Sequence, residues 1–543
     1  MAGLVLTEHL RVSFAAPRTG TGPLTFGQRD VLLRVSDGSN AIWTPLALPV
    51  GTLLADIAPA LSILLARHEA LRTRFVRDPE PAQVVGGPGV LAVDVLRIEP
   101  AAAEFADVQR QLVDHLRAQD IDIEAGPPLR VAVAVRDGAP TAAMMVCSPA
   151  LADIGGLAVV GRQFTELVAA SVAGHPVTDP GPRGHQPLDQ AEFERTAHRD
   201  GASAAVRFWI ERLRTAPQAM FPVPPAADPV AGHLSDLLRS AAAGRALAGI
   251  AERTGAEHQA VLLAAVCTVV SVRTGMSRFV FPVLSGNRDR LPDYVGVLAQ
   301  DGLLAFDVGG DSFAEVVRRV AAARLAADTH ARYDTTALRA ATERIAHERG
   351  VVFRRDFVFG ATTSEPELLT CQPVSLGPEL VLALTGNRRH VTGAELAALL
   401  CGMERLLLAA AAGPLPLTDL ADVTGVEPVR RGPGWALVDA CWVDLARVRG
   451  LVIEALRVPA AFVTATGDEL VAYLPATARA RTPPQAHTAC MADLGDRYNA
   501  MAPGYYVLCA GVPDDPADHA AWQALPVVAE GSGRSCVPTS KDG

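Results

Sequence analysis

Residues 144–156 read MMVCSPALADIGG, and they determine how the flanking sequence is interpreted. An apolar run ends in this stretch, a tight turn carries an acid, and two glycines lead into a helix predicted from about Leu157. Its apolar side chains recur with the period of one helix face: Leu157, Val160, Phe164, Leu167 and Val168. Before it, residues 132–146 read AVAVRDGAPTAAMMV and predict a hairpin of buried strands with RDGAP as its turn. Residues 147–156 are therefore expected to form a loop between a strand and a helix. Catalytic and binding residues often lie on loops that a rigid scaffold holds in place.

Asp153 is the only carboxylate in this loop, and its neighbours are alanine, leucine, isoleucine and glycine. Burying an unpaired charge is costly, so a carboxylate in such a place normally has a partner. The structural interpretation is an ion pair with an arginine from elsewhere in the chain. The functional interpretation makes Asp153 an acid, a base or an orienting group, and the loop sequence leaves both open.

The composition predicts a chain of two or three domains without nucleic-acid or membrane partners. It has 543 residues, 49% of them hydrophobic and 5% aromatic, with a net charge of −10 and no basic block. The eight cysteines form no Cys-x-x-Cys pair and no cluster with histidine, so neither a metal site nor a disulfide framework is expected. The only lysine is Lys541, which excludes a buried catalytic lysine from residues 1–540.

Scattered cysteines of this kind are typical of reduced thiols, and we expect a cytoplasmic protein. Glu8, His9 and Arg11 interrupt any signal-like apolar core at the N-terminus. The longest apolar helix, residues 395–413, carries Glu404 and Arg405 at its middle, which indicates a buried core helix. Searches for other catalytic motifs, including a Walker loop, a zincin motif and a dinucleotide fingerprint, give no match.

The loop resembles the signature loop of the condensation domains of nonribosomal peptide synthetases and related acyltransferases, His-His-x-x-x-Asp-Gly. Aligned without gaps, that pattern falls on residues 148–154, Ser-Pro-Ala-Leu-Ala-Asp-Ile. Only Asp153 is retained, and Pro149 stands where the family has its catalytic histidine. The resemblance implies a mixed α/β (α+β) fold of two chloramphenicol-acetyltransferase-like lobes in a V around a central channel. It implies lobes at residues 1–180 and 190–415, joined by the Pro- and Gly-rich segment 174–190.

Framework segments of the family are better kept than the signature loop. Pro23, Leu24, Thr25 and Gln28 match the family's opening Pro-Leu-Ser-x-x-Gln before a helix. Residues 67–75, RHEALRTRF, match Arg-His-Glu-x-Leu-Arg-Thr-x-Phe almost letter for letter. The apolar spacing of residues 57–76 predicts one amphipathic helix through this motif, with His68 as a structural histidine.

The second lobe carries the residue that the resemblance pairs with Asp153. A long helical stretch, residues 245–273, is predicted to break at Gly255, and a Gly-Asn-Arg turn follows at residues 286–288. The family's Ile-Gly-x-Phe-Val-Asn loop is matched at residues 294–300. We therefore predict a salt bridge between Asp153 and Arg288 that holds the loop in shape.

The resemblance also implies a set of channel residues, namely Gly155, Gly156 and His330. Tyr333 and His330 stand near the family's His-x-x-x-Pro-Phe segment, whose Pro-Phe is replaced here by Asp334-Thr335. In all, the resemblance covers roughly residues 20–415.

The tail, residues 435–543, resembles the small C-terminal subdomain of adenylate-forming enzymes. It predicts a helix capped by Asp444 and a hairpin that turns at residues 466–468. Ser532 stands where that family has its lysine, and the larger nucleotide-binding part has no counterpart in the chain. Adenylation is therefore not expected, and the tail is interpreted as a remnant or a docking element.

Two functions remain open on the sequence alone. The first is an amide-forming acyltransferase of peptide natural-product (antibiotic) biosynthesis that acts on carrier-bound thioesters without the usual histidine. Its candidate catalytic residues are Cys147, Ser148, Pro149 and Asp153, although proline cannot carry a proton and no histidine adjoins Cys147 to activate it. If the strand continued to Pro149, Cys147 would share its face and point into the histidine's space.

The second function is a non-catalytic recruitment or scaffold module for carrier proteins or tailoring enzymes, with other biosynthetic enzymes as further partners. Both functions predict carrier proteins as partners and no cofactor bound by the chain itself. The cofactor expected in either case is the phosphopantetheine of the carrier.

Overall fold

The computed structural model describes residues 3–34, 41–99, 104–176, 184–226, 229–360, 368–495 and 497–534. Lys541, Cys536 and the rest of the predicted tail beyond residue 534 lie outside the described residues, as does the middle of the predicted connecting segment, residues 177–183.

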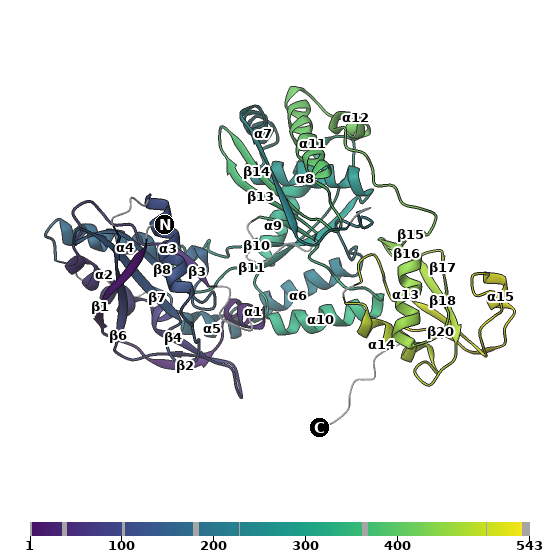
Figure 1. Cartoon of the computed structure of the whole chain (residues 1–543), viewed down its shortest axis with the longest axis horizontal. Helices are drawn as coiled ribbons and strands as arrows, with labels where there is room; N and C mark the ends of the chain where they lie inside the picture. The colour runs from purple at the N-terminus through teal and green to yellow at the C-terminus, as the bar shows by residue number, and fades with distance from the viewer. Residues whose placement is uncertain are drawn as a thin grey trace. The chain divides into compact units, whose positions relative to one another are not determined.

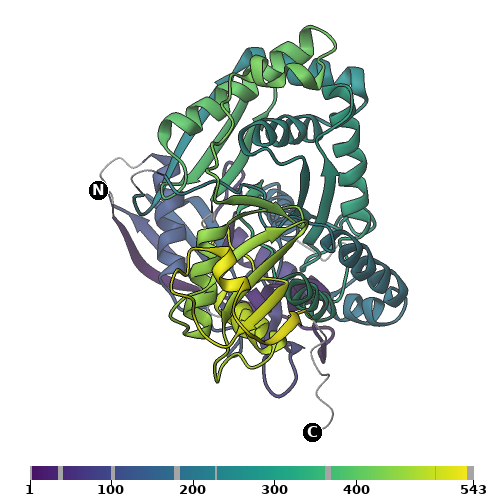
Figure 2. The same cartoon turned by 90° about the vertical axis from the view of Figure 1, so that its right-hand side faces the viewer.

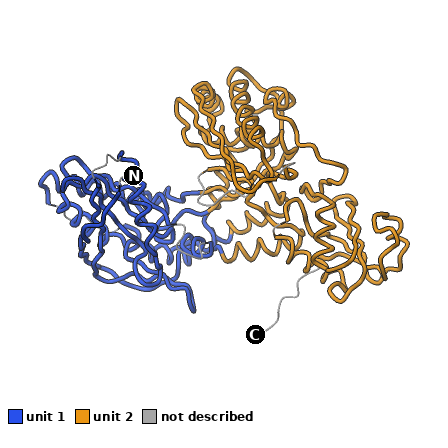
Figure 3. The backbone as a smooth tube through the Cα atoms, in the orientation of Figure 1, with its two compact units in different colours: residues 1–203, 285–300, 332–335 blue, residues 204–284, 301–331, 336–543 orange. Residues whose placement is uncertain are grey.

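The chain divides into two compact units, which Figure 3 shows in different colours. Unit 1 consists of residues 1–203, 285–300 and 332–335. Unit 2 consists of residues 204–284, 301–331 and 336–543. The signature loop and the segment that carries Arg288 thus both belong to unit 1.

Unit 1 is built on a five-stranded sheet with the strand order β1-β6-β7-β8-β3. Its strands are β1 (Leu4–Phe14), β3 (Ile42–Pro45), β6 (Gly89–Ile98), β7 (Leu129–Arg136) and β8 (Ala139–Cys147), and the helices that pack on it are α2 (Leu54–Arg67), α3 (Phe105–Arg117) and α4 (Ile154–Val172). Val131 and Val133 of β7 pack with residues of α2 and α4, whereas Ala132 and Ala134 pack with residues of α3. Because both faces are covered here, residues 131–135 of β7 are all apolar.

The predicted hairpin is confirmed. β7 and β8 pair antiparallel, and Asp137 and Gly138 form the turn with φ of 51° and 82°. Positive φ at both central residues is the geometry that an Asp-Gly turn favours. This hairpin sets the direction in which β8 delivers residues 147–156.

The prediction of one helix through residues 57–76 is wrong. Helix α2 ends at Arg67, a 3-10 turn η2 (Glu69–Arg72) follows, and β4 (Thr73–Val76) then pairs with β5 (Ala82–Val85) and, through it, with β2 (Gly20–Pro23). The apolar residues of β4 match the helical period only by coincidence. Antiparallel pairing with β5 makes this segment a strand. His68 is structural as predicted, because its Nε2 lies 2.8 Å from Gln163 Oε1. Helices α1 (Phe26–Arg34) and α5 (Pro187–Arg195) complete unit 1.

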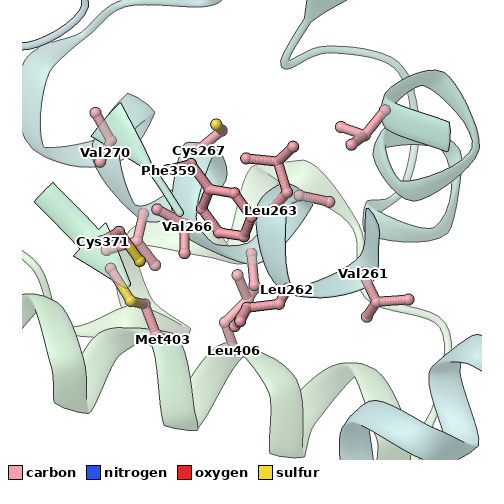
Figure 4. Close-up of a cluster of buried hydrophobic side chains, with 14 of the residues drawn as sticks. Val261, Leu262, Leu263, Val266, Cys267, Val270, Phe359, Cys371, Met403 and Leu406 are labelled. Atoms are coloured by element: carbon pink, nitrogen blue, oxygen red, sulfur yellow. The ribbon is translucent and has the colours of Figure 1, made fainter. Parts of the chain in front are cut away.

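Unit 2 contains a sheet of strand order β12-β13-β14-β9 and a large helical core. Its elements up to residue 424 are α6 (Arg199–Leu213), β9 (His233–Ser240), α7 (Ala241–Thr254), α8 (His258–Thr274), β10 (Arg278–Ser285), β11 (Gln300–Asp307), α9 (Phe313–Thr329), α10 (Thr335–Arg349), β12 (Phe357–Phe359), β13 (Leu369–Leu376), β14 (Leu380–Asn387), α11 (Gly393–Ala412), η3 (Leu417–Asp419) and α12 (Leu420–Thr424). Figure 4 shows α8 side chains such as Val266 packed against Met403 of α11 and Phe359 of β12. The predicted helix break is confirmed, because Gly255 ends α7 with a φ of 68°.

A small α+β subdomain follows from residue 435 and belongs to unit 2. It consists of β15 (Trp435–Val438), β16 (Cys441–Asp444), α13 (Leu445–Leu456), β17 (Phe462–Thr466), β18 (Glu469–Pro475), α14 (Pro483–Asp493), β19 (Tyr505–Cys509), α15 (His519–Gln523) and β20 (Val527–Ser532). Asp444 caps α13 as predicted, since its side chain accepts from the Ala446 N–H. The predicted hairpin of β17 and β18 is also present, with Gly467 at its turn.

The turn between β15 and β16 predicts a stabilising substitution. Asp439 and Ala440 both have positive φ, 47° and 60°. This left-handed backbone conformation costs about 1 kcal/mol at Ala440, because the Cβ atom crowds the following carbonyl oxygen. Ala440→Gly should therefore raise the stability of unit 2 by about 0.5–1 kcal/mol in calorimetry. Ala436→Gly, in the adjacent strand, is the matched control and should lower it. A loss of stability in Ala440→Gly would contradict the strain argument.

No single helix among the described residues is long and apolar enough to cross a membrane. Helices α7 and α8 reach that threshold only when taken together, and they are bent by 107°.

Candidate functional site

The signature loop is short, and its ends differ from the prediction. β8 ends at Cys147, so the strand does not continue to Pro149, and α4 begins at Ile154 rather than at about Leu157. The earlier start follows from Asp153, which is the N-cap of α4 and accepts a hydrogen bond from the Gly156 N–H at 2.8 Å. A carboxylate at this position satisfies a backbone donor that the first helical turn leaves unpaired.

Both oxygens of Asp153 are fully used within unit 1. Oδ1 accepts from the Gly156 N–H and from Nη2 of Arg288, and Oδ2 accepts from the N–H groups of Leu298 and Ala299 at 2.8 and 2.9 Å. An ionised carboxylate has about four lone-pair sites, and all four are occupied here. Asp153 therefore shapes the loop and has no free site for a substrate proton.

Arg288 is the partner that the sequence predicted, and the structure places the two side chains in an ion pair. The side chains are 10% (Asp153) and 19% (Arg288) exposed. Arg288 also donates through Nη1 to the carbonyl oxygen of Tyr294 at 2.7 Å. The pair joins the N-terminus of α4 to the segment 285–300 that connects β10 to β11.

Gly155 and Gly156 were predicted to line a channel, and the structure gives them a packing role beside this pair. A Cβ on Gly155 would overlap the Arg288 side chain, with Cδ and Cζ at 2.7 and 2.9 Å. A Cβ on Gly156 would approach the Gly296 carbonyl oxygen at 3.1 Å. The two glycines thus leave the space that the guanidinium and the backbone of residue 296 occupy.

The remaining loop residues have no activated nucleophile or base. Ser148 is 5% exposed, and its hydroxyl accepts from the Ala150 N–H at 3.3 Å. Pro149 has no titratable group. Cys147 is fully buried in the core of unit 1, and burial raises the pKa of its thiol to about 12. A thiol of this kind stays protonated near neutral pH, which argues against its use as a nucleophile.

Thiol labelling tests this interpretation of Cys147. An ordinary thiol has a pKa near 8.5, so the thiolate fraction of Cys147 at pH 8 should be about three orders of magnitude lower. Iodoacetamide should alkylate the exposed Cys401 readily and leave Cys147 unmodified in the folded chain. Peptide mapping by mass spectrometry measures both sites at once. Labelling of Cys147 within tenfold of the Cys401 rate would make it a reactive cysteine.

His330 is held in one orientation in unit 2. Its Nδ1 lies 2.8 Å from the Ala326 carbonyl oxygen, and its ring stacks on Phe208 with 4.1 Å between centroids. Because Nδ1 must carry the proton in this contact, Nε2 is left as a proton acceptor. His330 is thus a chemically competent imidazole, in a different unit from Asp153.

Sequence reasoning missed two buried titratable groups near the Asp153–Arg288 pair. Tyr294 is 3% exposed, and burial raises the pKa of its phenol well above the usual value. Burial raises the pKa of the Glu194 carboxyl to about 7, a value suited to acid–base chemistry. Its oxygens, however, accept from the Phe26 N–H and from Gln190 Nε2, both at 2.7 Å. No sequence signal marks Glu194, which lies in an ordinary charged helix.

Comparison with known proteins identifies the family. A sequence profile of the condensation domain matches residues 23–373. The chain belongs to the condensation-domain family. Chondramide synthase of Chondromyces crocatus is 26% identical over 284 residues, which are 50% of this chain and 7% of that protein. Malpinin synthetase of Mortierella alpina is 25% identical over 323 residues, 57% of this chain and 4% of that protein. The condensation-domain match thus spans only a small part of these relatives.

Solved condensation-domain structures share the mixed α/β fold. The X-domain from teicoplanin biosynthesis is 19% identical with a TM-score of 0.57, and the match covers 75% of this chain and 98% of that one. The first condensation domain of the calcium-dependent antibiotic synthetase is 18% identical with a TM-score of 0.57, covering 74% and 98%. The present condensation domain therefore keeps the family fold, and its Asp153 is held by Arg288 and by three backbone N–H groups. No group of three His, Cys, Asp or Glu side chains among the described residues could hold a metal ion.

Proposed function

We propose that this chain is a recruitment module of nonribosomal peptide assembly that binds carrier proteins and does not itself form the amide bond. The observation that carries the proposal is the chemistry of residues 147–153. The thiol is buried, the serine hydroxyl serves a turn, the proline has no proton to exchange, and all four acceptor sites of Asp153 are occupied.

Amide formation needs an amine freed of its proton and an oxyanion that is stabilised. Loss of a positioned base costs about 10²–10⁴ in rate. The intact Asp153–Arg288 pair is consistent with a loop whose role is to hold a fixed shape and not to transfer protons. The likeness in fold to the X-domain, which has been solved in a complex with OxyB, supports recruitment as the use of that shape.

Slow acyl transfer is the second candidate, and one observation favours it. His330 has the tautomer of a general base, with Nδ1 bonded to a carbonyl and Nε2 free to accept a proton. In that case the chain would act on carrier-bound acyl or aminoacyl thioesters by proximity, with an imidazole from outside the signature loop. The phosphopantetheine of the carrier would deliver the substrate.

Calorimetric titration of the full chain with a carrier protein tests recruitment. The carrier is used in three forms, without phosphopantetheine, with it, and with an acyl thioester on it. We expect saturable binding in the loaded forms and no amide product when an amine acceptor is added. Absence of binding to every form would contradict the proposal. Product formation that is lost in His330→Ala and kept in Cys147→Ala would establish the second candidate instead.

A further inference from the structure

The small subdomain shares its hydrophobic core with the rest of unit 2. Val351, which is fully buried just after α10, belongs to the same core cluster as the subdomain side chains, and Val352 and Phe353 pack against it. The Ala502 N–H donates to the Gly350 carbonyl oxygen at 2.8 Å. Figure 1 shows the subdomain, coloured light green to yellow, near one end of α10, and in Figure 2 the subdomain lies nearest the viewer. The segment after α10 and the subdomain therefore pack into one continuous apolar cluster.

Arg349 joins the subdomain to two other segments of unit 2. Its side chain is 8% exposed, and Nε and Nη2 donate to the side chain and the carbonyl oxygen of Asp439, at 2.7 and 2.9 Å. Nη1 donates to the carbonyl oxygens of Leu213 and Ala216 after α6. Separation of the subdomain would break both bonds from Arg349 to Asp439.

Further buried polar groups cross the same boundary. Asn499, 4% exposed, donates through Nδ2 to the Val223 carbonyl oxygen at 2.9 Å. His487, fully buried, places Nε2 at 2.8 Å from the His347 carbonyl oxygen. Each of these groups would lose its partner without an equivalent gain if the boundary opened partly. Two buried side chains of the subdomain thus bond across the boundary to backbone carbonyl oxygens of the rest of unit 2.

The connecting segment, residues 427–434, is bonded along its length. The Val429 N–H donates to the Arg273 carbonyl oxygen at 2.7 Å. Arg431 donates through Nη2 to the carbonyl oxygens of Pro222 and Thr274, both at 2.7 Å, and its guanidinium lies 4.3 Å from the centroid of Trp442. Burial lowers the pKa of Arg431 to about 10, so it remains charged near neutral pH. Val429 and Arg431 thus tie the middle of the segment to α8 and to Pro222.

We infer that residues 435–534 occupy one fixed position on unit 2 and move with it as a rigid part of the condensation scaffold. The subdomain then presents the same surface to solvent at all times. A rotation of the subdomain relative to the rest of unit 2 would break the contacts of Arg349, Asn499 and Arg431 together. This inference is independent of the proposed function, because it holds whether or not amide bonds form.

Hydrogen exchange of the wild-type full chain tests the inference directly. The Ala502 amide should exchange as slowly as the amides of the core helix α8, and calorimetry should show the subdomain unfolding together with the rest of unit 2. A separate, earlier transition of residues 435–534, or exchange of the Ala502 amide at least a hundredfold faster than that of α8, would overturn it.

Paired substitutions locate the effect. Arg349→Met should speed exchange of the Ala502 amide by at least about tenfold, because the partly exposed Asp439 carboxylate and the carbonyl oxygens of Leu213 and Ala216 lose their donor. Arg339→Met is the control on the same helix, since Arg339 pairs with Glu343 at a site where both side chains are more than 60% exposed, and it should leave that rate unchanged. Asn499→Gly, which keeps the backbone φ of 59° unstrained, should give a smaller increase if Arg349→Met does not fold. Equal rates in all variants and wild type would count against the inference.

Discussion

Replacing Arg288 by alanine is expected to lower the stability of unit 1 by about 3 kcal/mol. The substitution leaves the Asp153 carboxylate, 10% exposed, without its counter-charge. Removal of one partner from a buried pair costs about 3–5 kcal/mol, and we expect the lower end because three backbone N–H groups still donate to Asp153. Denaturant unfolding followed by circular dichroism, with hydrogen exchange of α4 to assign the transition to unit 1, measures the change.

The control for Arg288→Ala lies on α4 itself. Arg162 pairs with Asp293, but these side chains are 51% and 69% exposed. Exposed pairs contribute about 0–1 kcal/mol, so Arg162→Ala should have little effect. A loss of stability in Arg288→Ala no larger than that in Arg162→Ala would show that the Asp153–Arg288 pair does not hold the loop.

Gly155→Ala is expected to destabilise unit 1 by about 2–3 kcal/mol, although alanine normally favours a helix. The added Cβ would overlap the Arg288 side chain, whose Cδ and Cζ lie at 2.7 and 2.9 Å from its position. Arg288 cannot move aside freely, because its guanidinium is bonded to Asp153 and to the Tyr294 carbonyl oxygen. The substitution therefore strains the ion pair or breaks it, and the same unfolding experiment measures the cost.

Gly249→Ala is the matched control, since Gly249 lies within helix α7 and a Cβ there would meet only Arg253 Nη1, at 3.7 Å. Alanine at this position should raise the stability of unit 2 by up to about 1 kcal/mol. The two substitutions are chemically identical and should have opposite signs. A neutral or stabilising Gly155→Ala would contradict the packing of Arg288 described above.

Local patterns in the sequence predicted those features that depend on neighbouring residues. Asp137 and Gly138 fixed the turn of the β7–β8 hairpin, and Gly255 fixed the end of α7, because each requires a positive φ that few residues adopt. The apolar period alone predicts a start for α4 that is three residues late, because it does not include Asp153, which caps the helix.

Features that depend on distant segments could not be read in this way. Pairing of β4 with β5 interrupts a helical period, and nothing in residues 57–76 reveals the partner strand. The family resemblance supplied Arg288, but the backbone donors Leu298 and Ala299, 145 and 146 residues from Asp153, are visible only in the structure. These two N–H groups determine what Asp153 can do, because they occupy the last two hydrogen-bond acceptor sites of its carboxylate.

The most direct test is a single-turnover incubation of the wild-type chain with a donor carrier bearing an acyl thioester and an acceptor carrier bearing an aminoacyl thioester. Intact-protein mass spectrometry follows the amide product across neutral and alkaline pH. The signature loop as described predicts no product beyond that of the carriers alone, and no change in Cys147→Ala or Ser148→Ala. Product that requires the chain and disappears in either variant, while carrier binding is kept, would show that the loop handles protons or acyl groups after all.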